Sequence, residues 1–441
     1  MGDIAGFPYL EAEFTKEGAL LAPPDPKQIA DFVTSAGATD LLVISHGWNN
    51  DMDEARTLYR DFFGHARKAL QEGMVPGAAS RRFAVLGVLW PSKKFAEEDL
   101  IPGGGAGLGG AEDSAIGNRL EQLGQADPSA AAALGQARGL LDRLEHDSAA
   151  QRRFVDLVRS VVPRPKDTTD DASDQLFALP GDELLDMLSA PMLTLTPPSE
   201  ESGGAAGGVA TAAAGAQGQT AGLLDLGSGI KAGARRFLNF TTYYQMKERA
   251  GQVGAGGLNS VLRHLRTHGP AVRLHLIGHS FGGRLVAAAA DGPGDAPAVR
   301  IDSLTLLQAA FSHNGFAPRF DGTHDGFFRK IVAERKVAGP IVVTYTVNDK
   351  AVGLAYPLSS RLARQQSSAL GDANDPYGGI GRNGAVKTPE ARGGELLAAG
   401  SPYAFAPGAI YNLRADAYIT EHNDVARPET AYAMLSAVTA T

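Results

Sequence analysis

The residues best suited to do chemistry lie in the pentapeptide 278–282, which reads Gly-His-Ser-Phe-Gly. An apolar run that begins at Leu274 precedes it, and the alanine-rich segment RLVAAAA follows it. This pattern predicts a strand, a sharp turn and a helix. A serine on such a turn projects its hydroxyl from the edge of the sheet, and glycines on either side leave the backbone room to turn. We therefore predict that Ser280 is a nucleophile.

A nucleophilic serine needs a general base and a group that orients the base. Segments 300–312 and 340–352 each predict a buried strand, and Asp349 lies at the end of the second. Segment 409–419 predicts a further strand, which is followed by His422 and then by a last helix. Serine, aspartate and histidine in this chain order can form a catalytic triad. The sequence thus predicts Asp349 as the acid and His422 as the base.

The chain has 10 histidines, and the main alternatives to His422 are His46, His279, His313 and His324. His313 and His324 precede the predicted acid, so either of them would break the order of the triad. His279 directly precedes the serine, and its side chain is expected to point away from that of the serine. His46 belongs to a separate loop. Chain order therefore favours His422.

Three other aspartates, Asp302, Asp416 and Asp424, compete with Asp349 for the role of the acid. Asp302 begins a predicted strand, which would place it at the opposite edge of a parallel sheet from the serine. Asp424 lies just beyond His422 and is expected to cap the last helix or to orient the loop. The prediction for Asp349 rests on its position just past the end of a strand.

A tetrahedral intermediate also needs N–H donors for its negative oxygen. The apolar strand predicted over 41–45 runs into His46, Gly47 and Trp48, and then into an amphipathic helix. A glycine at this point allows the backbone to present the next amide inward, so the amides of Trp48 and Phe281 are the predicted oxyanion donors. The indole of Trp48 then forms a wall of the acyl site, or alternatively packs under the loop.

Six segments together resemble an uncharacterised esterase/lipase-like branch of the α/β-hydrolase superfamily. They are HGWNND, LWPS, NFTTYYQMKERAG, IGHSFGG, TVNDKAV and EHNDV, and the resemblance covers residues from about 35 to 92 and from about 235 to 441. It implies a triad of Ser280, Asp349 and His422 and an oxyanion hole of Trp48 and Phe281. Esterases, lipases, amidases, thioesterases and acyltransferases share these motifs, so the resemblance leaves the substrate open.

The expected fold is an α/β-hydrolase fold with a mostly parallel central sheet, flanking helices and a large insertion. Residues 1–92 and 235–441 form the predicted core, and residues 93–234 form a helical and low-complexity cap. Within the cap, 115–123, 131–145 and 149–162 have helical spacing, whereas 197–222 is predicted to be a linker. The cap is expected over the carboxyl edge of the sheet, either as a lid or as a structural insert.

Composition narrows the class of protein. The 441 residues carry a formal net charge of −8, which argues against nucleic acid or an anionic membrane as a partner. The chain has no cysteine, which fits a reducing compartment, and neither a secretory signal nor an apolar membrane span is apparent, so a cytoplasmic location is expected. No metal-ligand motif appears, and the glycine-rich run 101–110 lacks the Lys-Ser/Thr ending of a phosphate loop. No cofactor is therefore expected.

These observations predict a serine hydrolase that cleaves small or lipid-like carboxylic esters through an acyl-enzyme intermediate. His46, Gly47, Tyr243 and Tyr244 are candidate substrate-binding residues, although the two tyrosines also fit an ordinary helix core. An amidase, a peptidase or an acyltransferase would use the same triad, and a hydrolase scaffold used only for binding is the alternative outside catalysis. The sequence does not indicate the oligomeric state.

Overall fold

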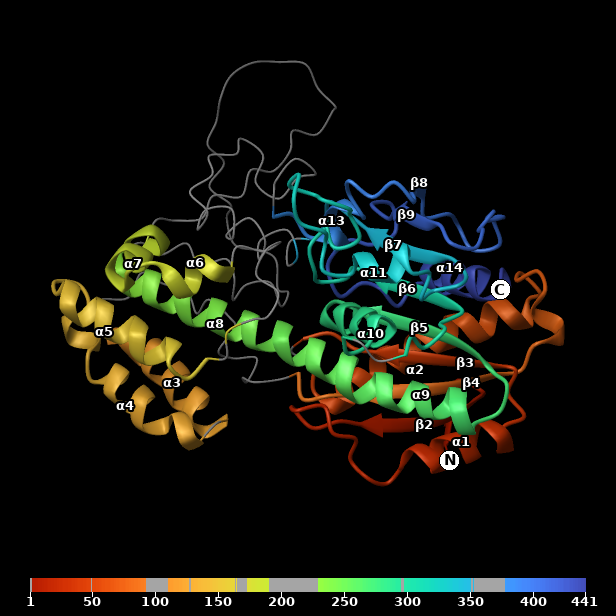
Figure 1. Cartoon of the computed structure of the whole chain (residues 1–441), viewed down its shortest axis with the longest axis horizontal. Coiled ribbons are helices and arrows are strands. Elements are labelled where there is room, and N and C mark those ends of the chain that lie inside the picture. Colours follow the sequence, from red (N-terminus) through yellow and green to blue (C-terminus); the bar gives the residue numbers. More distant parts are fainter. Residues whose placement is uncertain are drawn as a thin grey trace, which may run out of the picture. The chain divides into compact units, whose positions relative to one another are not determined.

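The computed structural model describes residues 2–48, 50–92, 110–126, 128–162, 164, 173–189, 229–294, 297–349, 352 and 377–441 (Figure 1). The chain divides into two compact units. The first comprises Met1–Lys94, Val162–Ala178 and Thr241–Thr441, and the second comprises Phe95–Val161 and Leu179–Phe240. The linker predicted over 197–222 and nearly all of the glycine-rich run 101–110 lie outside the described residues.

The first unit is built on a sheet of nine described strands in the order β1-β2-β4-β3-β5-β6-β7-β9-β8. The strands are β1 Gly2–Ile4, β2 Phe7–Glu13, β3 Asp40–Ser45, β4 Phe83–Leu89, β5 Arg273–His279, β6 Ser303–Leu307, β7 Ile341–Tyr345, β8 Ala391–Glu395 and β9 Ile410–Arg414. Only β1 pairs antiparallel, with β2, and the other pairs are parallel. The predicted mostly parallel sheet is therefore confirmed.

The central strands are apolar along their whole length because both faces of the sheet are covered. Leu42 and Ile44 of β3 belong to the cluster of buried side chains that includes Tyr59 and Tyr432 from two flanking helices. The alternate residues Leu41 and Val43 point to the other face and are also buried. Near-continuous apolar runs of this kind are typical of parallel strands covered on both sides.

The helices of the first unit include α1 Pro26–Ser35, α2 Met52–Gln71, α6 Ser173–Ala178, α9 Asn259–His268, α10 Phe281–Asp291, α11 Arg329–Ala333, α13 Ile380–Asn383 and α14 Pro428–Thr439. Helices α2 and α14 pack against each other, whereas α10 packs on β3, β5 and β6. Asp51 caps α2, since its carboxylate accepts from the amides of Asp53 and Glu54. None of the described helices is both long and apolar enough to cross a membrane.

Helix α8 (Ile230–Gln252) contributes residues to both units and is followed by the π-helical segment η6 (Val253–Leu258), which leads directly into α9. Both η6 and α9 contact α10, the helix that begins directly after the predicted nucleophile. A π-helical turn inserted in a helix is a rare feature that the sequence pattern does not indicate.

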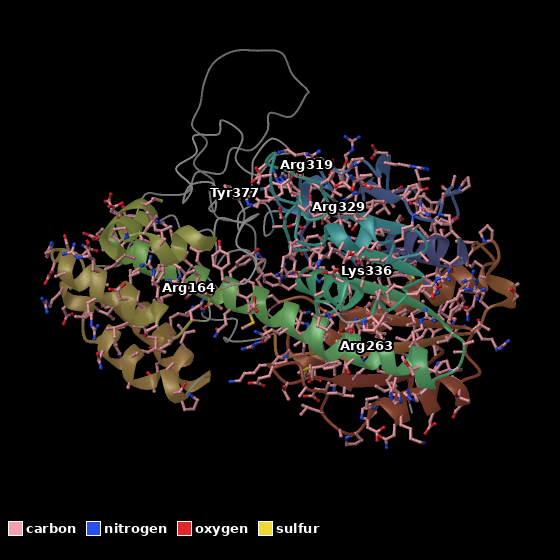
Figure 2. The ribbon with its side chains drawn as sticks, viewed as in Figure 1. Arg164, Arg263, Arg319, Arg329, Lys336 and Tyr377 are labelled. Atoms are coloured by element: carbon pink, nitrogen blue, oxygen red, sulfur yellow. The ribbon has the colours of Figure 1, made fainter. Side chains whose placement is uncertain are left out.

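The connection between β6 and β7 is fixed by ion pairs of two residues labelled in Figure 2. The guanidinium of Arg329 donates to both carboxylate oxygens of Glu390, each at 2.8 Å. The ammonium of Lys336 lies 2.7 Å from a carboxylate oxygen of Asp291, the last residue of α10. Both cations are largely buried, so these pairs tie the connection to α10 and to the segment before β8.

The described part of the second unit is helical. It contains α3 Gly110–Ala126, η3 Pro128–Ala130, α4 Ala131–Arg138, η4 Leu141–Arg143, α5 Ser148–Arg159, α7 Gly181–Ser189 and the first part of α8. Phe154 of α5 is fully buried and packs edge-on against Phe237 of α8, with 6.4 Å between ring centroids. The helix predicted over 131–145 is divided, because α4 ends at Arg138 and a separate 3-10 turn follows it.

Candidate active site

Ser280 lies on the turn between β5 and α10. Its backbone angles are φ 55° and ψ −125°, a strained conformation for a residue with a side chain. A Cβ at Gly278 would lie only 2.3 Å from the carbonyl oxygen of Gly282, so the turn can close only where the first of these residues has no side chain. The amide of Ser280 donates to the carbonyl of Leu307 on the neighbouring strand at 3.1 Å. The predicted strand, turn and helix are thus present.

The structure brings Ser280 together with the predicted acid and base. The Nε2 atom of His422 lies 2.8 Å from Oγ of Ser280, and its Nδ1 atom lies 2.8 Å from Oδ2 of Asp349. Asp349 is fully buried, and its other carboxylate oxygen accepts from the amide of Val352 at 2.9 Å. A carboxylate on Nδ1 keeps the proton there, which leaves Nε2 free to accept the proton of the serine.

Two of the competing aspartates have other partners. Asp302 directly precedes β6, at the opposite edge of the sheet, and accepts from Arg266 at 2.6 Å and from the amide of Leu274 at 2.8 Å. Asp424 accepts from the amide and hydroxyl of Thr420, at 3.1 and 2.9 Å, and therefore orients the loop. Asp424 does not cap α14, whose N-cap residue is Arg427.

The third competing aspartate, Asp416, connects the turn that carries Asp349 (the acid turn) to the loop that carries His422 (the histidine loop). Its Oδ1 atom accepts from the hydroxyl of Thr346 at 2.8 Å and from the amide of Val347 at 3.1 Å. The side chain of Asn348 extends in the other direction and donates to the carbonyls of Asp416 and Ile419 at 3.2 and 2.9 Å. The loops that carry Asp349 and His422 are therefore held together by side chains on both.

The site forms at one edge of the sheet because its residues follow strands that run in the same direction. Gly47 follows β3, Ser280 follows β5, Asp349 follows β7 and His422 follows β9, and these strands are all parallel. Strands β3 and β5 are neighbours, although β4 lies on the other side of β3. The strand order thus reverses between β3 and β5, and open parallel sheets bind ligands beyond the carboxyl ends of strands at such a point.

The segment predicted to stabilise an oxyanion lies against the serine. A Cβ at Gly47 would lie 2.7 Å from Cβ of Ser280 and 3.1 Å from Nδ1 of His279, so no side chain fits there. Phe281 is the first residue of α10, and the first amides of a helix have no partner within the helix. The backbone of Gly47, directly before Trp48, and the start of α10 are therefore both close to Ser280.

An aromatic cluster adjoins these backbone segments. The ring of Tyr243 lies 6.4 Å from that of Trp48 and 5.1 Å from that of Phe281, between centroids, and Trp48 and Phe281 are 6.1 Å apart. Tyr244 packs edge-on against Tyr243 at 5.3 Å, and both tyrosines are almost fully buried. The indole nitrogen of Trp48 is buried without a hydrogen-bond partner among the described residues. Gly47, Trp48 and Tyr243 thus lie near the serine, and Tyr244 lies behind Tyr243.

His46 is enclosed by the protein, which corrects its prediction as a substrate-binding residue. Its ring is fully buried and stacks on Trp90, with 5.6 Å between centroids. Its Nδ1 atom lies 3.0 Å from the carbonyl of Gly47, and its Nε2 atom accepts from the amide of Trp90 at 3.3 Å. Burial lowers the pKa of His46 to about 4. This neutral ring therefore supports the turn at Gly47 and is not exposed to a substrate.

His279 lies at the site, contrary to the expectation that its side chain points away from the serine. Its Nε2 atom lies 3.0 Å from the carbonyl oxygen of His422, and the two rings are 5.0 Å apart between centroids. Burial, followed by the proximity of His422, lowers the pKa of His279 to about 3. This position depends on a contact with a distant loop, so the sequence pattern of one strand does not predict it.

The buried rings of His46 and His279 predict that acid destabilises the fold. In the unfolded chain an imidazole has a pKa of about 6.5, whereas the folded values are about 4 and about 3. Below about pH 6.5 the unfolded state therefore binds more protons, and the free energy of unfolding falls by up to about 1.4 kcal/mol per pH unit for each group. Urea titrations at pH 7 and pH 5 measure this loss.

A pair of single substitutions assigns that loss to a particular ring. The His279→Gln protein should lose less stability between pH 7 and pH 5 than the wild type, because one buried imidazole is gone. The His268→Gln protein removes an imidazole that is exposed at the end of α9, and it should match the wild type. An equal loss of stability in all three proteins would contradict the role of the buried rings.

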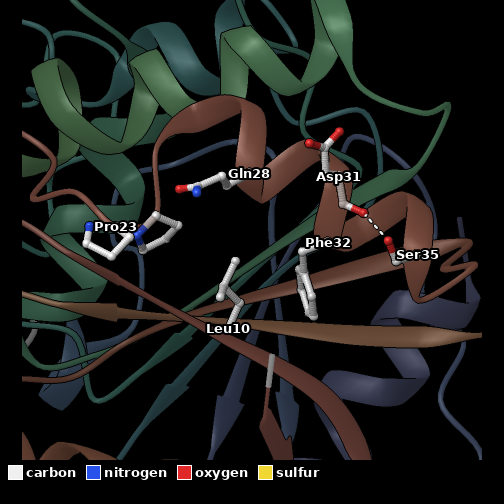
Figure 3. A pocket seen from close by; sticks show the side chains of 7 residues that line it. Leu10, Pro23, Gln28, Asp31, Phe32 and Ser35 are labelled. Carbon is white, nitrogen blue, oxygen red and sulfur yellow. Dashed lines mark hydrogen bonds between the residues drawn. The ribbon is translucent and has the colours of Figure 1, made fainter.

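A surface pocket of about 450 Å³ lies elsewhere in the first unit, between β2 and α1 (Figure 3). It is lined by Leu10, Pro23, Pro24, Gln28, Asp31, Phe32 and Ser35. None of these residues belongs to the group around Ser280. Among the described residues, no group of three or more histidine, aspartate or glutamate side chains is placed to hold a metal ion.

The arrangement around Ser280 has the parts that nucleophilic catalysis requires. These are a hydroxyl on a strained turn, a base within hydrogen-bonding distance, a buried carboxylate on that base, and helix-start and glycine-turn amides nearby. No family model, curated protein or solved structure matches the chain. The chemistry of the site therefore rests on its own geometry.

Proposed function

We propose that this chain is a serine hydrolase that cleaves carboxylic esters through an acyl-enzyme intermediate. The observation that carries the proposal is the hydrogen-bonded line from Ser280 through His422 to Asp349, with 2.8 Å at each step. Its members come from three strand ends that are far apart in the sequence. The serine also has a positive φ, and strained backbone of this kind is common at active sites.

In the proposed mechanism, Oγ of Ser280 attacks the ester carbonyl while Nε2 of His422 takes its proton. Asp349 holds the imidazolium that forms, and the amides of Trp48 and Phe281 stabilise the negative oxygen. The bond to the leaving alcohol then breaks, and His422 returns the proton to that alcohol. A water molecule enters, gives a proton to Nε2 of His422 and attacks the acyl group. The second intermediate collapses as His422 returns this proton to Oγ of Ser280, which releases the carboxylic acid and regenerates the serine hydroxyl.

The topology supports an α/β-hydrolase fold for the first unit. The serine is on the turn between a central strand and a helix, the acid follows a later strand, and the histidine lies in the loop before the last helix. The segment with Gly47 follows the strand next to that of the serine, where this fold takes one of its oxyanion donors.

The aromatic cluster of Trp48, Tyr243 and Phe281 favours an apolar acyl group. These rings adjoin the two backbone segments that would hold the oxyanion, and an acyl chain extends from that point. Small or lipid-like esters are therefore the proposed substrates. Hydrolysis of p-nitrophenyl esters of increasing acyl length measures the preference, and a rate that does not depend on chain length would contradict an apolar acyl site.

A fluorophosphonate probe tests for an activated serine without knowledge of the substrate. We expect the probe to label the native protein, and mass spectrometry of the peptides to place the label on Ser280. Heat-denatured protein should not react, because unfolding separates the serine from its base. Native protein that neither reacts with the probe nor hydrolyses any ester of the series would contradict the proposal.

Substitution of Gly47 by alanine should lower kcat/KM for ester hydrolysis by about 10²-fold, because small displacements of reacting groups have effects of this size. The added Cβ would lie 2.7 Å from Cβ of Ser280, so either the glycine turn or the serine must move. Steady-state kinetics with a p-nitrophenyl ester measures the effect.

Gly64→Ala is the matched control, since a Cβ at Gly64 in α2 has no heavy atom within 4 Å. It should keep the kcat/KM of the wild type. Thermal unfolding of both variants separates a local effect from a loss of fold. A Gly47→Ala protein with wild-type kcat/KM would show that the turn does not approach the reacting groups.

A further inference from the structure

We propose that His279 is a positioning residue, which holds the loop of His422 to the strand that carries the nucleophile and fixes the distance between base and serine. The proposal rests on the proposed function, because it assigns a role within the same site. It concerns a side chain that neither attacks the substrate nor transfers a proton.

The first argument is the hydrogen bond between His279 and the loop that carries His422. A backbone carbonyl can only accept, so Nε2 of His279 carries the proton and donates it to the carbonyl oxygen of His422 over 3.0 Å. His279 is 3% exposed, so its side of this bond is shielded from water. The last residue of β5 thus holds the backbone of the base directly.

The second argument is the contact on the other side of the ring. A Cβ at Gly47 would lie 3.1 Å from Nδ1 of His279, so the glycine turn and the imidazole pack closely. His279 therefore lies between the segment with Trp48, one of the two predicted oxyanion donors, and the loop of His422. Burial keeps its pKa low, so the ring stays neutral when His422 gains a proton during the reaction.

The third argument comes from the other contacts of the loop that carries His422. Asn348 and Asp416 tie this loop to the turn of Asp349, and Asp349 itself fixes the ring of His422. These bonds align the base with the acid. The bond from His279 holds the same loop to β5, whose next residue is the serine, and so aligns the base with the nucleophile.

Two substitutions of His279 distinguish the effect of its hydrogen bond from the effect of its side-chain volume. His279→Leu removes the donor and keeps an apolar side chain, whereas His279→Gln keeps an N–H at a similar distance from the backbone. We expect His279→Leu to lower kcat and the rate of fluorophosphonate labelling by about 10²-fold with little change in KM, since a shift of about 1 Å has effects of this size. His279→Gln should recover most of that loss.

A spectroscopic measurement reports the same geometry without turnover. The proton between Nδ1 of His422 and Asp349 should give a downfield resonance in the wild type, which His422→Ala removes and thereby assigns. We expect this resonance to shift or broaden in His279→Leu and to return in His279→Gln. The exposed His268→Leu is the control, and it should leave the rates and the resonance unchanged.

The outcomes distinguish the two proposals. If His279→Leu unfolds at a lower temperature but its folded molecules react at the wild-type rate and keep the resonance, the role of His279 is structural and the inference fails. If the resonance responds to His279→Leu as expected but the wild type is never labelled at Ser280, the positioning role stands and the proposed function fails.

Discussion

Substitution of Ser280 by alanine is expected to lower kcat for ester hydrolysis by about 10⁶-fold, the effect of removing the nucleophile from a triad. The hydroxyl oxygen forms the bond of the acyl-enzyme, and its proton goes to Nε2 of His422, which lies 2.8 Å away. The residual rate comes from binding and from the oxyanion donors alone. Steady-state kinetics with a p-nitrophenyl ester measures kcat, and the absence of a fluorophosphonate label confirms that the serine is gone.

Ser312→Ala is the matched control for this experiment. Ser312 follows β6 at the same edge of the sheet, is 2% exposed, and accepts from the amide of Asn314 at 3.1 Å. Its loss removes a hydroxyl of similar burial but leaves the triad intact, so kcat should stay near the wild-type value. A Ser280→Ala protein as active as Ser312→Ala would show that another group is the nucleophile.

Substitution of Asp349 by asparagine should lower kcat by about 10⁴-fold, because an amide in place of the carboxylate favours the wrong tautomer of the histidine. The carboxylate accepts the Nδ1 proton of His422 over 2.8 Å, and an asparagine can turn its NH₂ group toward that nitrogen instead. The proton then moves to Nε2, which can no longer accept from the serine. KM should change little, because the acid does not contact the substrate.

Asp416→Asn tests whether the acid is correctly assigned. Asp416 keeps a carbonyl oxygen after this change, so it can still accept from Thr346 and from the amide of Val347. Its kcat should stay within about tenfold of the wild type, since both hydrogen bonds remain and their weakening on loss of the charge costs about 1 kcal/mol. A large loss in Asp416→Asn with an active Asp349→Asn would reverse the roles of the two aspartates.

Chain order predicted which residues meet, because parallel strands place their carboxyl ends at one edge of the sheet. The apolar runs that contain β3, β5, β7 and β9 are visible in the sequence. They lead to Gly47, Ser280, Asp349 and His422, which the structure brings together. The boundaries were less accurate. The strand predicted over 300–312 is only Ser303–Leu307, because Gln308 has a φ of 44° and its side chain bonds to Thr344 and to the carbonyl of Gly381.

The role of His279 and the burial of His46 could not be predicted from the local pattern. Each depends on a partner in a distant part of the chain, the carbonyl of His422 in one case and Trp90 in the other. The short strand β8 was not predicted either, since ARGGE has neither the apolar alternation nor the β-branched residues of a typical strand. Its pairing with β9 determines its structure.

Hydrogen bonds join the turn that carries Asp349 to the loop that carries His422. The site therefore consists of two halves with separate tasks. Asp349 and His422 form one half, which Asn348 and Asp416 hold together, while Ser280 forms the other with the glycine turn. Strand β6 lies between the strands of the two halves and contributes none of these residues. A change in the twist of the sheet at β6 would therefore load the bond from His279 to the loop of His422, the contact that joins the two halves, and would alter the distance from base to nucleophile while the proton on the histidine stayed correctly placed.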